Sequence, residues 1–291
     1  KVVAIGGGTG LSTMLKGLKL HTHNITAVVT VADDGGSSGI LRSDLGMLAP
    51  GDVRNCVSAL AEVDPVMGEL LNFRFKDGSL KGHSLGNLFL AALNETSSSF
   101  DEAVKKFSHL TGVVGTVYPV TNESVTLSAL LEDGRLIEGE SHIGVHHDGP
   151  KNGIVKLMVN PEKPKAVDGV IKALEKADII VLGPGSLYTS IIPNLLVDGV
   201  VDAIKKSNAV KIYVCNIMSQ AGETENYTVS DHLAAIERHS YEGIADIVIA
   251  NNAIIPESLR IKYASEHARE VMIDSINVLN KRSQKSETCA R

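Results

Sequence analysis

The sequence predicts an α/β fold, a Rossmann-like three-layer sandwich with a largely parallel central sheet and a β-rich insertion. Short apolar runs alternate with amphipathic stretches towards both ends of the chain, which is typical of βαβ units. Glycine-rich turns follow several of these runs, as in open parallel sheets that bind ligands at the carboxyl ends of their strands. Of the 291 residues 43% are hydrophobic, so one large domain over 1–291 is expected.

The first part of the chain is expected to alternate strands and helices. Apolar runs and helical spacing predict these elements in order: strand 1–5, helix 11–20, strand 25–32, and helices that begin near 52, 87 and 100. Asp52 follows the turn Pro50-Gly51, and we expect its carboxylate to cap the helix that begins there.

The middle of the chain differs, because 116–121 and 124–131 are rich in β-branched residues. Asp133-Gly134 is a hairpin turn signal, and 136–142 would be the returning strand. A β-rich insertion over 111–165 is therefore expected. The α/β alternation then resumes in this order: helix 167–176, strand 177–182, a helix-like segment interrupted at 193, helix 200–206, strand 210–217, helix 229–237 and strand 244–250.

Charge and composition narrow the classes of partner. The net charge is -6 and the chain has no long basic block, so neither nucleic acid nor an anionic membrane is an expected partner. Aromatic residues make up 4% of the chain, which disfavours a base-stacking surface. Cys56, Cys215 and Cys289 form no Cys-x-x-Cys pair, and no apolar run has the length of a membrane span. We therefore expect no membrane insertion and a cytoplasmic location.

The first glycine turn, Gly6-Gly7-Gly8-Thr9-Gly10, directly follows the first apolar run. Glycine lets the backbone approach a phosphate closely, and the helix that follows supplies N–H groups and a favourable dipole. Gly7, Gly8, Thr9 and Gly10 are therefore candidate phosphate ligands. The turn matches the NAD fingerprint only in part, because Leu11 stands where that fingerprint needs Gly or Ala. A dinucleotide-dependent oxidoreductase stays an alternative.

The second glycine turn follows the run 25–32 and begins with two adjacent carboxylates. Its candidate ligands are Asp33, Asp34, Gly35, Ser37 and Ser38. The carboxylates could bind Mg²⁺ with substrate phosphates completing its shell, or one could accept hydrogen bonds from a ribose or sugar hydroxyl. Asp44 joins Asp34 as a candidate Mg²⁺ ligand. The structural alternative is a solvated turn.

Two further motifs offer polar side chains. Arg54 and Asn55 lie in the first turn of a predicted helix, where Arg54 is either a phosphate clamp or a surface residue. Residues 82–86, Gly-His-Ser-Leu-Gly, match the nucleophile motif of serine hydrolases, but turn-like charged residues precede them instead of a strand. A hydrolase is therefore disfavoured, whereas His83, Ser84 and Asn87 stay candidates to reach a ligand.

The later strands are also followed by polar turns. Gly183, Pro184, Gly185 and Ser186 are typical of a second anion-binding turn, and the alternative is a strand-to-helix turn with a serine cap. The loop after strand 210–217 offers amide and hydroxyl groups suited to a base or a sugar, namely Asn216, Gln220 and Thr224, although an ordinary polar loop is the alternative.

One histidine-rich segment suggests a metal site, but a solvated loop explains it better. His142, His146, His147 and Asp148 lie in a return loop that contains glycine, and their spacing is not that of a zinc site. We therefore interpret this segment as a solvated loop.

Taken together, the motifs closely resemble the gluconeogenesis-factor family, the YvcK-like proteins, in order and over nearly the whole chain. The resemblance rests on five segments: 6–10, 32–39, 51–55, 82–87 and 182–190. That family shares a superfamily with the CofD-like 2-phospho-L-lactate transferase, which moves a phospholactyl group from a guanosine diphosphate conjugate to a deazaflavin. The transferase resemblance is weaker, because the Gly-Ser-Ser-Gly extension after Asp34 and the segment 82–87 depart from it.

The resemblance implies a single CofD-like domain in a cytoplasmic protein that binds a nucleotide sugar, UDP-N-acetylglucosamine. It implies a regulatory role, required for normal growth and cell shape on gluconeogenic carbon sources, and no firm catalytic turnover. The alternative is a Mg²⁺-dependent transferase of phospholactyl type that acts on a nucleoside diphosphate conjugate. A homo-oligomer is also expected.

Overall fold

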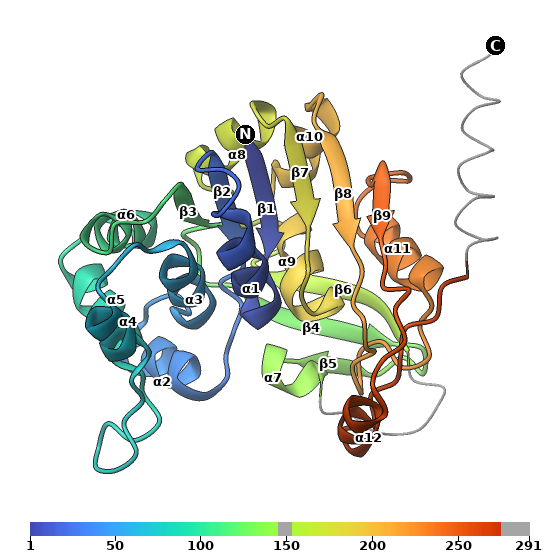
Figure 1. Ribbon diagram of the computed structural model, residues 1–291, viewed down its shortest axis with the longest axis horizontal. Helices are drawn as coiled ribbons and strands as arrows, with labels where there is room; N and C mark the ends of the chain where they lie inside the picture. The colour runs from blue at the N-terminus through green and yellow to red at the C-terminus, as the bar shows by residue number, and fades with distance from the viewer. Residues whose placement is uncertain (145–152, 275–291) are drawn as a thin grey trace.

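The computed structural model describes residues 1–144 and 153–274, and its centre is a parallel sheet (Figure 1). The sheet has six strands in the order β3-β2-β1-β7-β8-β9, and every neighbouring pair is parallel. Its strands are β1 (Val2–Gly6), β2 (Ile25–Val29), β3 (Thr116–Pro119), β7 (Ile179–Leu182), β8 (Val210–Val214) and β9 (Ile247–Ile249). The predicted α/β fold is confirmed.

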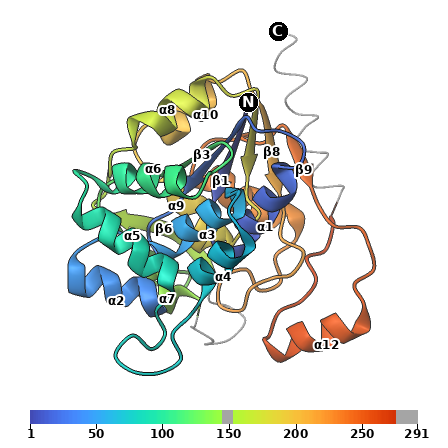
Figure 2. The ribbon, with the colours of Figure 1, turned by 60° about the vertical axis from the view of Figure 1, so that its left-hand side comes forward.

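Helices cover both faces of this sheet and complete a three-layer sandwich (Figures 1 and 2). The first half of the chain contributes α1 (Gly8–Leu18), α2 (Gly36–Leu45), α3 (Gly51–Leu60), α4 (Pro65–Asn72), α5 (Leu85–Glu95) and α6 (Phe100–Leu110). The second half contributes α7 (Glu140–Ile143), α8 (Asp168–Glu175), a π-helix η1 (Leu187–Ile191), α9 (Ile192–Leu195), α10 (Val200–Lys206), α11 (Val229–Arg238) and α12 (Glu257–Ser265). Every helix in the described ranges is too short or too polar to cross a membrane.

A second, antiparallel sheet lies at the carboxyl ends of the central strands (Figure 1). Its order is β5-β4-β6, formed by β4 (Thr126–Leu131), β5 (Leu136–Glu138) and β6 (Ile154–Asn160). The expectation of a β-rich insertion over 111–165 was too wide, because Thr116–Pro119 pairs with β2 as the edge strand of the central sheet. β-branched residues favour parallel and antiparallel strands alike, so local composition did not separate the two sheets.

Apolar strand residues build a core that spans both sheets. Ile5 and Val28 are fully buried in the central sheet, and Leu127 and Leu157 of the second sheet belong to the same hydrophobic cluster. The central strands are apolar on both faces because helices cover both sides. The sequence also predicted a helix from 11, whereas α1 begins at Gly8. The prediction missed the first turn because glycines carry no periodic signal that would mark it.

Candidate functional site

The candidate site begins where strand order reverses in the central sheet. β1 lies between β2 and β7, and the chain runs from β1 to β2 in one direction and from β7 to β8 in the other. The crevice at the carboxyl ends of two such strands is where open α/β sheets bind ligands. Both predicted anion-binding turns lie at this switch point, because one follows β1 and the other follows β7.

The two turns touch each other. A Cβ atom added to Gly10 would lie 3.0 Å from the carbonyl oxygen of Pro184, and one added to Gly185 would lie 3.3 Å from the carbonyl oxygen of Gly7. Gly8 and Gly183 have φ of 67° and 80°, a region in which glycine is favoured. The structure therefore brings Gly7, Gly8, Thr9 and Gly10 beside Gly183, Pro184, Gly185 and Ser186.

Ser190 and Asn194 support the two turns from below. Cβ of Ser190 would lie 3.4 Å from a Cβ on Gly7 and 3.2 Å from one on Gly185. The amide of Asn194 is fully buried and donates to the carbonyl oxygens of Gly6 and Ser190, at 3.1 and 2.7 Å. The sequence predicted that Pro193 interrupts a helix, and this prediction was wrong. Pro193 occupies the first turn of α9, where its missing N–H is tolerated.

Asp33 and Asp34 face different parts of the molecule. Oδ1 of Asp33 accepts a hydrogen bond of 3.0 Å from the N–H of Gly35, and its Oδ2 would lie 3.0 Å from a Cβ on Gly51. Both oxygens of Asp34 accept backbone N–H groups at the start of α7, from Glu140 at 2.9 Å and Ser141 at 2.8 Å. Asp33 therefore lies towards α3, whereas Asp34 joins the second glycine turn to the second sheet.

Asp52 does not cap its own helix, which corrects the expectation from the sequence. The N-cap of α3 is Pro50, and Asp52 lies inside the first turn. Its Oδ2 would lie 2.6 Å from a Cβ on Gly7, so the carboxylate packs against the first glycine turn. Burial raises the pKa of Asp52 from 3.8 to about 6, and a hydrogen bond from the backbone of Gly8 opposes that rise. Sequence reasoning therefore placed Asp52 on the correct helix but in the wrong role.

A group of carboxylates surrounds the switch point, and we call it the carboxylate cluster: Asp33, Asp34, Asp52, Glu140 and Glu223. Burial raises the pKa of Glu140 from 4.5 to about 7, and the charges of the other four carboxylates add to the rise. Burial also raises the pKa of Glu223 to about 7, although the Tyr188 N–H, 3.3 Å away, donates to its carboxylate. The cluster therefore places five carboxyl groups beside the two predicted anion-binding turns.

Three predicted motifs meet in a buried hydrogen-bond network. The side-chain amide of Asn87 donates to Oγ of Ser37 at 3.1 Å, and Oγ of Ser37 lies 3.0 Å from Nδ1 of His83. The Arg54 guanidinium donates to Oδ1 of Asn87 at 3.3 Å and to Oδ1 of Asn72 at 2.9 Å. Arg54 is thus buried among amide oxygens rather than exposed, and the network holds the second glycine turn against α3 and α5.

The remaining members of these motifs lie close by. Oγ of Ser38 accepts the N–H of Gly51 at 3.2 Å, and Asn55 is half-buried on α3. Ser84 is the N-cap of α5, and its Oγ accepts the N–H of Asn87 at 3.2 Å. No strand of the kind that a hydrolase nucleophile needs precedes Ser84 among the described elements.

The loop after β8 forms one wall beside the switch point. Thr224 is fully buried, and its Oγ1 accepts the N–H of Gln220 at 2.9 Å, so this hydroxyl stabilises the loop itself. The side-chain oxygens of Asn216 and Gln220 are buried and accept no hydrogen bond from the described part of the chain. These two amides remain available as acceptors for a ligand.

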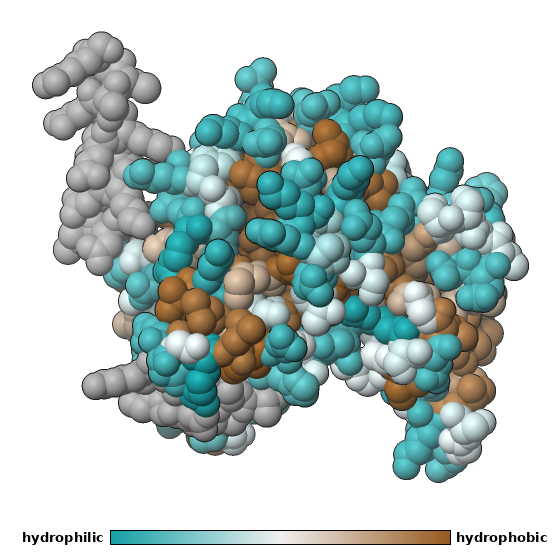
Figure 3. All heavy atoms as spheres, turned by 180° about the vertical axis from the view of Figure 1, so that it is seen from behind, coloured by the Kyte–Doolittle hydropathy of each residue, from teal (hydrophilic) through white to brown (hydrophobic). Residues whose placement is uncertain are grey.

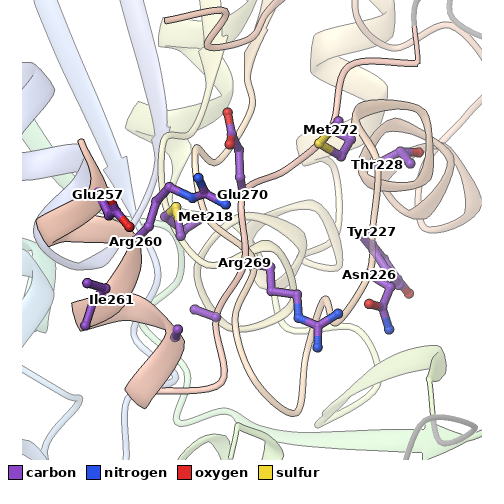
Figure 4. Close-up of a pocket in the computed structure, with 12 residues that line it drawn as sticks. Met218, Asn226, Tyr227, Thr228, Glu257, Arg260, Ile261, Arg269, Glu270 and Met272 are labelled. Carbon is purple, nitrogen blue, oxygen red and sulfur yellow. The ribbon is translucent and has the colours of Figure 1, made fainter. Parts of the chain in front are cut away.

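A cavity of about 650 Å³ lies on the other side of this loop, beneath α12 (Figure 4). Met218 and Tyr227 of the loop line it, and Figure 4 shows Glu257, Arg260 and Ile261 on α12 around it. No side chain of α12 is buried, so this helix stands off the domain. α12 carries no signal in the sequence, because its apolar residues follow no helical period.

Some predicted site residues lie apart from the switch point. Asp44 is exposed on the last turn of α2, about 12 Å along the helix axis from Gly36, and it accepts a hydrogen bond from Ser43. Within 1–144 and 153–274 no group of three His, Cys, Asp or Glu residues is arranged to hold a metal ion. His146, His147 and Asp148 lie outside the described residues, and His142 bonds to the carbonyl oxygen of Glu138 at 2.8 Å.

Comparison with known proteins matches this arrangement to one family. The family model for 2-phospho-L-lactate transferase CofD matches residues 2–289. The chain belongs to the CofD family. This confirms the superfamily that the sequence predicted.

Within the CofD family, this chain is similar to proteins named gluconeogenesis factor. A "Gluconeogenesis factor" from Halalkalibacterium halodurans is 48% identical over 94% of this chain, and one from Bacillus subtilis is 46% identical over 94%. This chain spans 84% and 86% of their respective lengths. A relative from Clostridium acetobutylicum is 52% identical over 97% of this chain, which spans 62% of that protein.

A crystal structure agrees with the fold of this CofD family member. It is described as a member of the UPF0052 family from Bacillus halodurans and superimposes with a TM-score of 0.93 at 46% identity. The match covers 96% of this chain and 89% of that chain.

Proposed function

We propose that this protein binds UDP-N-acetylglucosamine at the switch point and acts in the cytoplasm as a regulatory protein. In this proposal it is required for normal growth and cell shape on gluconeogenic carbon sources. The observation that carries the proposal is the contact between two glycine turns at the carboxyl ends of β1 and β7. The name gluconeogenesis factor, which relatives carry, supports the metabolic context.

The diphosphate of the ligand would lie on the two turns. Gly7, the N-cap of α1, has no side chain to cap the helix, and the first turn of α1 holds no acidic residue. Backbone N–H groups at this helix end are therefore suited to phosphate oxygens. Gly10 and Gly185 let the turns approach closely enough to contact one diphosphate together.

The polar groups around the turns suit the sugar, the ribose and the base. Asp33 and Glu140 are carboxylates that can accept hydrogen bonds from hydroxyl groups, and protonation of Glu140, whose pKa is about 7, would reduce repulsion of the diphosphate. The buried amide oxygens of Asn216 and Gln220 would gain donors from the ligand.

Isothermal titration calorimetry against UDP-N-acetylglucosamine, GDP and NAD, each with and without Mg²⁺, tests this proposal. We expect the nucleotide sugar to bind at micromolar concentration without metal. Absence of binding at millimolar ligand would overturn the proposal, and binding of NAD alone would favour an oxidoreductase.

A second candidate is a transferase of phospholactyl type, favoured by the matching family model and by the carboxylate cluster. Mg²⁺ is commonly held by one or two carboxylates together with substrate phosphates, so Asp33 or Glu140 could contribute one ligand each while the metal neutralises phosphate charge. Asp34 fits less well, because both of its oxygens accept N–H groups of α7, and Asp44 is remote. GDP binding that requires Mg²⁺, together with turnover that Asp33→Asn abolishes without unfolding, would favour this function.

A further inference from the structure

A cavity of about 360 Å³, which we call the α8 cavity, lies between α8 and the beginnings of the central strands. The first residues of β1, β2 and β3 and one side of α8 line it. In Figure 1 α8 and the N-terminus lie at the top, at the opposite end of the central sheet from α12, and Figure 3 shows mostly hydrophilic side chains at this end. The α8 cavity is therefore separate from the switch point, which lies at the carboxyl ends of the strands.

Small residues of α8 leave this space open. Gly169 and Ala173 are one helical turn apart, and both line the cavity. Gly169 packs on the ring of Tyr118, because a Cβ there would lie 2.5 Å from Cζ and 2.8 Å from the hydroxyl oxygen. The buried apolar residues of α8, Val170 and Leu174, do not line the cavity. α8 therefore contacts β3 closely at Gly169, and the cavity extends from there past Ala173.

The central sheet supplies hydroxyl groups to the α8 cavity. Thr26 of β2 and Thr116 of β3 are paired in register, and both line the cavity together with Tyr118. Residues two apart on a strand lie on the same face of a sheet, so Tyr118 shares the face of Thr116. All three residues are half-buried. Three hydroxyl groups that can each donate a hydrogen bond are therefore gathered on one face.

The charged residues that line the α8 cavity are basic. Lys172 and Lys176 line it from α8 and its end, and Lys1 lines it from the start of β1. Of the described residues that line the cavity, none is Asp or Glu, and Asp178, which pairs with the main-chain amine of Lys1, lies outside the lining. Within 1–144 and 153–274 the ammonium groups of Lys172 and Lys176 form no ion pair. Both are therefore available to a ligand, in a chain whose net charge is -6.

This combination of groups is suited to phosphate. Lysine ammonium groups bind phosphate as compact point charges, and hydroxyl groups donate hydrogen bonds to phosphate oxygens. A cavity lined by one sign of charge also raises the local concentration of ions of the opposite sign. The volume of the α8 cavity is at the lower end of the range for small-molecule sites, so a large cofactor is excluded.

We propose that the α8 cavity binds a phosphate dianion, either free or as the phosphomonoester of a small hydroxylated molecule. Lys172 and Lys176 neutralise the phosphate, and Thr26 and Thr116 donate to its oxygens or bond to the hydroxyl groups of the ligand. The proposal is independent of the nucleotide-sugar site, because the two sites lie at opposite ends of the central strands.

Isothermal titration calorimetry of the whole chain with inorganic phosphate and with glycerol 3-phosphate, at a fixed ionic strength of about 0.1 M, tests the proposal. We expect at least one of the two to bind with a Kd below about 1 mM. Lys172→Gln should raise that Kd at least about tenfold, because a hydrogen bond to a charged group is lost. Ala173→Leu should have the same effect, because the larger side chain fills the cavity without changing its charge. Lys262→Gln is the matched control, since Lys262 is exposed on α12 at the other end of the sheet.

The outcomes separate the two sources of phosphate and the two sites. Tighter binding of glycerol 3-phosphate supports a phosphomonoester, and equal or weaker binding of it supports free phosphate. Absence of binding of both probes up to about 10 mM overturns the proposal. Binding that persists unchanged in Lys172→Gln and Ala173→Leu also overturns it, because the anion then lies elsewhere, and loss of that binding in Gly10→Ala would place it on the glycine turns.

Two further measurements keep this test separate from that of the proposed function. UDP-N-acetylglucosamine titrated into Lys172→Gln and Ala173→Leu should bind as it does to the unchanged chain, so either proposal can fail alone. Circular dichroism melting of each variant shows whether a loss of phosphate binding is a loss of fold, and Lys172→Gln, at an exposed position, leaves the core intact.

Discussion

The backbone N–H of Leu157 donates a hydrogen bond to Nε2 of His239, with 2.8 Å between the nitrogens. Nδ1 of the same ring lies 2.7 Å from the carbonyl oxygen of Ala235, so it carries the proton and the ring is neutral. The pair joins β6 of the second sheet to α11 of the sandwich. Because the second sheet also carries α7 and Glu140, this contact stabilises one side of the candidate site.

The contact between His239 and Leu157 should fail at low pH. Burial lowers the pKa of His239 below its ordinary value of 6.5, and the positive charges of Arg238 and Lys156 lower it further. The unfolded chain therefore binds the proton more readily, so this contribution is complete above about pH 6.5 and is lost as the pH falls.

A pair of variants tests this pH dependence. His239→Gln keeps an acceptor without a titrating group, so it should remove this part of the stability loss below about pH 6.5. His239→Leu should cost about 1–3 kcal/mol at every pH, because the buried N–H of Leu157 loses its acceptor. Thermal melting from about pH 5 to about pH 8 measures both, with the exposed His21→Gln as control. An unchanged profile in His239→Gln would contradict the assignment.

Glu223 should make the folded chain less stable as the pH rises, which is the opposite of the pH dependence expected from His239. Its pKa is raised from 4.5 to about 7 in the folded chain. The contribution of the protonated Glu223 to the free energy of unfolding is therefore complete below about pH 4.5 and is lost as the pH rises towards 7. Glu223→Gln should therefore stabilise the protein at about pH 8, by at most about 3 kcal/mol. Chemical denaturation at about pH 5 and about pH 8 measures this, with exposed Glu225→Gln as the matched control. Destabilisation of Glu223→Gln at the higher pH would show that the carboxylate charge is required.

Gly10→Ala should separate the two glycine turns. The new Cβ would lie 3.0 Å from the backbone oxygen of Pro184, so one turn must shift by a few tenths of an ångström. We expect nucleotide-sugar affinity to fall about tenfold or more, because the N–H groups no longer converge on one diphosphate. Gly17→Ala is the control, since its Cβ meets nothing within 4 Å and should stabilise α1 by about 0.5–1 kcal/mol. Equal affinities in the two variants would argue against the shared phosphate site.

Asp34 should be needed to hold α7 in place. Asp34→Ala removes both acceptors for the N–H groups of Glu140 and Ser141 and should cost about 0.5–2 kcal/mol, as lost helix caps do. Asp34→Asn keeps one acceptor oxygen and should have the smaller effect. Hydrogen exchange at Glu140 and Ser141 reports the loss locally. Unchanged protection in Asp34→Ala would mean that α7 is held by other contacts.

Much of the fold could be predicted, because its signals are local. Continuous apolar runs indicate strands that are buried on both faces, and glycines directly after them indicate turns at the carboxyl end of a parallel sheet. The run 2–5 and the turn 6–10 carry both signals side by side, which is why β1 and the first turn were placed correctly. β3 was assigned to the wrong sheet, because a strand's partners depend on contacts that no local pattern records.

The candidate site also has features that the sequence could predict and features that it could not. Asp33 and Asp34 are neighbours in sequence and have equal side chains, so nothing local indicates that one faces Gly51 and the other faces α7. Glu140 follows the hairpin of the second sheet without a motif of its own, and it reaches the site because that sheet lies at the carboxyl ends of the central strands.

The sequence by itself determined the α/β fold, the two glycine turns and the family, because each depends on short patterns of glycine and apolar residues. Only the tertiary structure decided that the turns touch, that Asp52 faces Gly7 rather than its own helix, and that Arg54 is buried among amide oxygens. These features depend on the packing of segments distant in sequence, and packing sets both the distances between groups and the burial that shifts the pKa values of Asp52, Glu140 and Glu223.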